Sequence, residues 1–181
     1  MRALLPALVI LAGCPSWPIQ GSVAEALDGK PLSIHSTKQR CQKGAEAVAA
    51  ADLAVPIALD VYRANGWCTD YDPDIYGKAH VCIIDQPEPC EPLPWPRHGC
   101  ATMYGIQQSI KWPPLCEPGM PDALKCVESK EQQRSNWIRN FVHEVTNMVL
   151  WRCGIYDPPY KHPARGLEGE IWKRFEAANG R

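Results

Sequence analysis

Three neighbouring polar residues, His143, Glu144 and Asn147, have the types and spacing that could hold and use a metal ion. Residues four apart lie on the same face of an α-helix, so the imidazole of His143 and the carboxamide of Asn147 would project side by side. The carboxylate of Glu144 would lie beside them, where it could take a proton from a metal-bound water. This arrangement favours metal-assisted hydrolysis.

A helix is predicted from Lys130 to Cys153, and it would position this set. Apolar residues recur in it at the i, i+3, i+4 spacing of one helix face: Trp137, Ile138, Phe141, Val142, Val145, Met148 and Val149. At about 100° per residue, His143 and Asn147 lie on the side opposite this stripe. We therefore expect the polar set to point away from the hydrophobic face. The periodicity also fits ordinary polar residues on the outer face of an amphipathic helix.

The segment Phe141 to Trp151 resembles the active-site helix of zincin-type zinc metallopeptidases. It reads apolar, apolar, His, Glu, apolar, Thr and then Asn147, where the H-E-x-x-H motif has its second histidine. The resemblance implies that His143 and Asn147 are zinc ligands and that Glu144 is the catalytic base. A carboxamide oxygen suits zinc less well than an imidazole. Asn147 is therefore expected to weaken metal binding, and with it catalysis.

A zincin needs a third ligand downstream of the motif helix. The resemblance implies His162, which precedes a C-terminal helix predicted over 167–178, with Glu168 and Glu170 as alternatives. His162 as a plain loop residue stays equally open. The remaining histidines are expected to be surface or packing residues: His35, His80 and His98.

The chain before the motif helix predicts a scaffold helix and a small sheet. Helical signals cover 38–65, where Pro56 is expected to kink or divide the helix. Three strands are predicted, over 78–85, 100–104 and 106–112. This order resembles the N-terminal part of the zincin fold and implies an α+β, zincin-like domain. In that family an edge strand lies beside the substrate backbone, a role implied here for 106–111.

The N-terminus has the form of a bacterial export signal. Met1 and Arg2 precede about ten mostly apolar residues, a run too short to span a membrane. Leu11 to Cys14 reads Leu-Ala-Gly-Cys and resembles the lipobox of bacterial lipoproteins, which implies that Cys14 carries the lipid. We expect a signal peptide over 1–13, a tether over 14–37 and a zincin-like domain over 38–181. An ordinary cleaved secretory signal is the alternative.

The cysteine content fits an exported, disulfide-stapled chain. Without Cys14, eight cysteines remain, which implies up to four disulfides with 105 possible pairings. The loop over 115–129 is expected to be closed by its own pair. The eight are Cys41, Cys68, Cys82, Cys90, Cys100, Cys116, Cys126 and Cys153.

Charge and composition narrow the class of function. Nineteen basic and twenty acidic residues give a net charge near zero, and the sequence has no basic run. Both features argue against a nucleic-acid partner. The expected partners are a peptide or protein substrate and a membrane of the bacterial cell envelope, reached through the N-terminal lipid. Trp95 and Trp112 are candidates for a binding surface or for structural aromatics.

Two functions are compatible with these features. The first is an envelope zinc metallopeptidase-like protein that hydrolyses peptide bonds through metal-activated water. The second is a catalytically inactive zincin-like protein, or an unrelated disulfide-rich lipoprotein, that acts as a binding or structural module.

Overall fold

The computed structural model describes residues 21–30, 39–89, 96–116, 126–156 and 163–180. It confirms the predicted α+β class, with a small sheet and four α-helices in the described part of the chain. The helices are α1 (Ala45–Ala64), α2 (Pro73–Tyr76), α3 (Lys130–Arg152) and α4 (Glu168–Ala178). A 3-10 turn, Pro163–Leu167, leads into α4. None of these helices has the length and hydropathy needed to cross a bilayer.

The main sheet has four strands in the order β1 (Ala24–Ala26), β2 (Ala79–Ile84), β6 (Gly105–Ser109) and β5 (Gly99–Thr102). The first three run parallel, and β5 is antiparallel to β6. The predicted strands correspond to β2, β5 and β6. A two-stranded ladder, β3 (Glu88–Pro89) and β4 (Pro96–Arg97), lies outside this sheet.

Strand β1 is a correction to the expected tether over 14–37. It pairs with the start of β2, and the carboxylate of Asp52 in α1 accepts hydrogen bonds from the backbone N–H groups of Val23 and Ala24. A strand of three residues is too short to show a periodic pattern, and a distant side chain holds it in place. The folded domain therefore includes part of the expected tether.

The edge strand is also a correction, because 106–111 was expected to fill that role. Strand β6 pairs with β2 on one side and with β5 on the other, so β5 is the last strand of the sheet. Gly105 makes the inner position possible, since a Cβ there would lie 2.3 Å from the carbonyl oxygen of His80. Glycine is the residue that allows such a close approach of two backbones.

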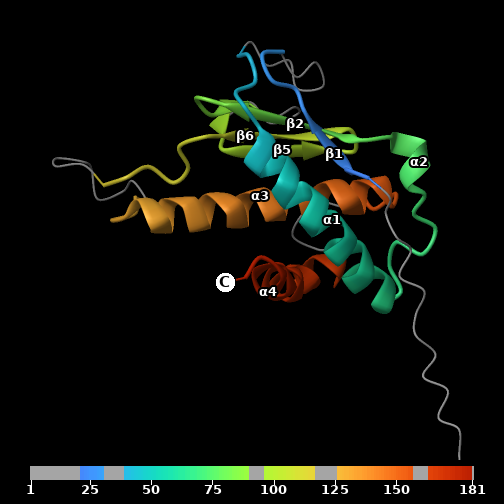
Figure 1. Cartoon of the computed structure of the whole chain (residues 1–181). Coiled ribbons are helices and arrows are strands. Elements are labelled where there is room, and N and C mark those ends of the chain that lie inside the picture. The colour runs from blue at the N-terminus through green and yellow to red at the C-terminus, as the bar shows by residue number, and fades with distance from the viewer. Residues whose placement is uncertain (1–20, 31–38, 90–95, 117–125, 157–162, 181) are drawn as a thin grey trace, which may run out of the picture.

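Helix α3 is the centre of the domain. One side of it packs against β5 and β6, and α1 and α4 pack against other sides (Figure 1). All seven residues of the predicted apolar stripe are buried. Helix α1 runs without a break through Pro56, so the expected division into two helices is wrong. Buried residues on both sides of Pro56, such as Val55 and Leu59, hold α1 in place although one backbone donor is missing.

Disulfides hold the ends of these elements together, as expected. Cys68 and Cys153 join the loop after α1 to the end of α3, and Cys41 and Cys82 join the segment before α1 to β2. The predicted loop pair, Cys116 and Cys126, is confirmed. Cys100 is also disulfide-bonded. Cys14 and Cys90 lie outside the described residues.

Candidate functional site

The motif residues occupy the middle of α3, where the helix passes beneath β5. Glu144 and Asn147 are 9% and 8% exposed, so the side of the helix that carries them is covered and is not an outer face in water. The reason is that α3 is contacted by the sheet as well as by two helices, and Glu144 lies against β5. Gly99 of β5 leaves the space, because a Cβ there would lie 2.9 Å from Oε1 of Glu144.

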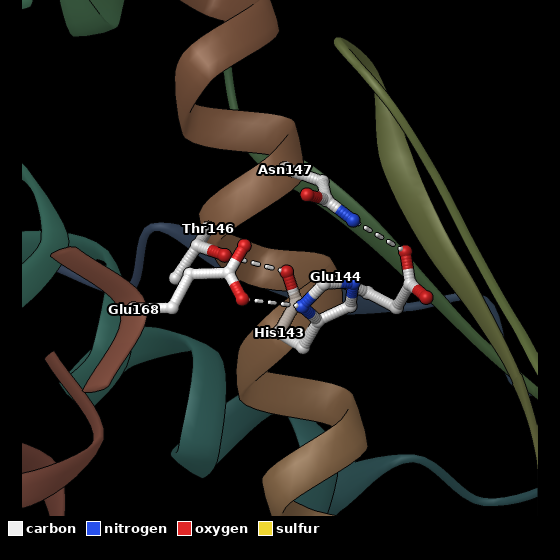
Figure 2. A network of polar contacts seen from close by, with 5 residues as sticks. All are labelled: His143, Glu144, Thr146, Asn147 and Glu168. Atoms are coloured by element: carbon white, nitrogen blue, oxygen red, sulfur yellow. Dashed lines mark hydrogen bonds and ion pairs between the residues drawn. The ribbon is translucent and has the colours of Figure 1, made fainter. Parts of the chain in front are cut away.

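Glu144 and Asn147 are bound to each other. Nδ2 of Asn147 donates a hydrogen bond of 3.2 Å to Oε2 of Glu144 (Figure 2). Oδ1 of Asn147 is buried and has no hydrogen-bond partner in the described part of the chain. A buried acceptor of this kind costs about 1–3 kcal/mol when it stays unpaired. The residue at the second histidine position of the motif therefore contacts the expected base directly.

His143 faces another element, the start of α4. Its Nδ1 lies 3.0 Å from Oε2 of Glu168, with the two side chains 40% and 30% exposed (Figure 2). The hydroxyl of Thr146 donates to the backbone carbonyl of His143 at 2.7 Å. A carboxylate at Nδ1 selects the tautomer that carries its proton there, which leaves Nε2 as the nitrogen with the lone pair.

The third-ligand candidates have different surroundings. Glu168 contacts the ring of His143 as described, whereas Glu170 forms an exposed ion pair of 2.5 Å with Arg174. His162 lies outside the described residues. Sequence reasoning thus named the carboxylate that reaches His143, but as an alternative.

The donor set does not fit a catalytic zinc site within the described part of the chain. No group of three or more His, Cys, Asp or Glu side chains there could hold a metal. The unpaired Oδ1 of Asn147 could face a cation, but a carboxamide oxygen is a weak, hard donor for zinc. The arrangement present is two hydrogen-bonded pairs, His143 with Glu168 and Glu144 with Asn147.

A cleft of about 720 Å³ runs along α3 and is lined by the first of these pairs, His143 and Glu168. Its floor is a polar row on α3 that includes Asn136, Arg139, Asn140 and His143. One wall is formed by residues near the Cys116–Cys126 loop, among them Trp112 and Val127, and the other by α4 with Glu168 and Trp172. A volume of this size falls within the usual range of ligand-binding clefts.

The two other described histidines, His80 and His98, contact residues that are not part of the motif. His80 forms an ion pair of 3.0 Å with Glu25 of β1. His98 stacks on Trp112, with ring centroids 3.8 Å apart, and burial lowers the pKa of His98. Trp112 thus lines the cleft, and its ring is held by the stack on His98. His35 and Trp95 lie outside the described residues.

Sequence reasoning missed Gly99, Arg139 and Trp172. The sequence could have identified Arg139, because it precedes His143 by four residues and so lies on the same helix face. It could not have identified Gly99 and Trp172, since their places depend on how β5 and α4 pack against α3. Comparisons with protein-family models, with curated proteins and with solved structures found no match to this chain.

Replacing Gly99 by alanine should disturb the Glu144 and Asn147 pair. The new Cβ would lie 2.7 Å from Nδ2 of Asn140 and 2.9 Å from Cγ of Glu144. Overpacking of this kind typically costs about 1–3 kcal/mol, and we expect that loss in chemical denaturation of Gly99→Ala. Gly169→Ala is the matched control, because nothing lies within 4 Å of a Cβ there. Equal stability of the two variants would contradict the close contact between α3 and β5.

The stability of the domain should fall in acid partly through His98. Burial lowers its pKa below the ordinary value of 6.5, so the folded state favours the neutral ring. The stabilisation is present above the unfolded pKa and is lost as the pH falls through the lower folded pKa. Denaturation between pH 5 and 8 should show this loss, and His98→Gln should reduce it while His80→Gln should not remove it. An NMR titration midpoint of His98 at or above 6.5 would refute the assignment.

Proposed function

We propose that this chain is a lipid-anchored protein of the bacterial cell envelope whose zincin-like domain binds an extended peptide segment without hydrolysing it. The hydrogen bond between Asn147 and Glu144 carries this proposal. At the position where a zincin has its second metal ligand, the chain has a carboxamide that donates to the expected base. The motif helix therefore keeps its place while its metal chemistry is replaced by a buried polar pair.

The arrangement of elements supports the zincin-like part of the proposal. The scaffold helix α1 is followed by β2, β5 and β6, of which β5 is the antiparallel edge strand, and then by the motif helix, which packs against β5. Glu144 lies against Gly99 of this last strand. In the resembling family, the edge strand accompanies the substrate backbone, so β5 takes the role expected for 106–111.

The cleft supports binding of an extended segment. It lies along α3 and is lined by both aromatic and polar side chains, which is typical of binding sites that orient a ligand through a few polar groups. An extended peptide would lie along α3, between the wall that carries Trp112 and Val127 and the wall formed by α4. Cys14, as the lipid-bearing residue, would keep the domain at a membrane surface.

One observation favours a second function, an active zinc peptidase. Glu168 holds Nδ1 of His143, and metal-binding histidines are commonly oriented by a carboxylate in this way. In that case His143, Asn147 and a downstream donor, His162 or Glu168, would hold zinc, which would activate water beside Glu144. The two functions predict different metal content and different activity.

Zinc content and peptide hydrolysis decide between them. The purified chain from residue 14 onward, with Cys14→Ser, should retain far less than one zinc per chain after loading and washing. Its hydrolysis of a mixed fluorogenic peptide library should equal that of Glu144→Gln. A stoichiometry on the order of one zinc per chain, together with hydrolysis that Glu144→Gln abolishes, would establish the peptidase instead.

The anchor is tested separately from the cleft. Expressed in a bacterial host with radiolabelled palmitate, the full chain should take up label and fractionate with membranes. Cys14→Ser should lose both, because the thiol that would carry the lipid is gone, whereas Cys116→Ser should keep them. Unchanged labelling of Cys14→Ser would remove the lipoprotein assignment and leave the cleft proposal intact.

A further inference from the structure

Arg139 is a cation placed in the cleft without a carboxylate partner. Its guanidinium lies over the ring of Trp172, 5.9 Å from the ring centroid, and it forms no ion pair with the described acidic residues. Two other exposed arginines on α3 and α4 are paired, Arg134 with Glu46 and Arg174 with Glu170. The cleft therefore presents a positive charge that no ion pair among the described residues neutralises.

Two tryptophans from different parts of the chain line the cleft together with this charge. Trp112 is held by its stack on His98, and Trp172 lies near Phe175 with ring centroids 5.6 Å apart. Aromatic side chains that are held in place offer a large apolar surface at little cost in conformational entropy. The walls suit an apolar side chain, and the floor suits an anion.

We propose that Arg139, Trp112 and Trp172 form a recognition site for a peptide carboxylate next to an apolar side chain. This inference rests on the proposed peptide-binding function and names its ligand chemistry. The planar guanidinium matches a carboxylate through two parallel hydrogen bonds, which a lysine cannot reproduce. The apolar side chain beside the carboxylate lies between the two indoles.

The position of Arg139 also sets the register of the bound chain. It precedes His143 by one helical turn, about 6 Å along α3. An extended peptide advances about 3.3 Å per residue, so about two residues separate the bound carboxylate from the part of the peptide beside His143. The carboxylate comes either from the C-terminus of the peptide or from an aspartate or glutamate side chain.

Four matched hexapeptides separate these sources. The first ends in phenylalanine with a free carboxylate, and the second is the same peptide amidated. The third and fourth are amidated, with glutamate or glutamine before the phenylalanine. Titrations followed by tryptophan fluorescence and calorimetry should show about 10- to 100-fold tighter binding of the first than the second, or of the third than the fourth, as expected for charge-assisted hydrogen bonds.

Variants assign the effect to Arg139. Arg139→Gln should remove the preference for the carboxylate, and Arg139→Lys should recover only part of it. Arg174→Gln is the matched control and should bind like the parent chain, because Arg174 lies outside the cleft lining. Trp172→Leu should weaken binding of a peptide ending in phenylalanine more than that of one ending in alanine.

The outcomes distinguish the carboxylate site from the proposed peptide binding on which it rests. Equal binding of acid and amide peptides, unchanged in Arg139→Gln, would overturn the carboxylate site while peptide binding stands. Failure of all four peptides to bind would overturn the peptide-binding proposal itself, and the carboxylate site with it. Loss of binding in Arg174→Gln as well would assign the effect to overall charge and would also overturn the site.

Discussion

The structure depends on the enclosure of α3 by the sheet, α1 and α4. A helix contacted on several sides cannot turn all of its polar residues to water, so its middle turn must bury some of them. Burying a carboxylate and a carboxamide is costly unless they are hydrogen-bonded, and Glu144 and Asn147 meet this need partly by bonding to each other. The hydrogen bond between Glu144 and Asn147 thus lowers the cost of burying these two polar side chains in the packing of α3.

Several parts of the fold could be predicted because their signals are local. The apolar stripe of α3, the three strands of the middle region and the pair Cys116 and Cys126 all followed from periodicity or spacing. Strand β1 could not, because it is three residues long and is held by Asp52, which lies 28 residues away from Ala24. The identity of the edge strand failed for a related reason, since pairing order is a property of the folded sheet and not of one strand.

The site shows the same division between local and non-local information. Spacing placed His143 and Asn147 one turn apart, but it could not show that Glu144 and Asn147 face β5 while His143 faces α4. Periodicity reports which side of a helix is most apolar, and it says nothing about how many sides are covered. The position of Glu168 depends on the docking of α4, whose buried residues Ile171 and Phe175 pack in the common core.

His143 and Glu144 are neighbours in the sequence, but they face different parts of the domain. Consecutive helical residues point about 100° apart, and here one is held by α4 and the next lies against Gly99 of β5. Of the two residues only His143 lines the cleft, together with Glu168. A ligand in the cleft therefore meets the pair of His143 and Glu168, while the pair of Glu144 and Asn147 belongs to the packing between α3 and β5.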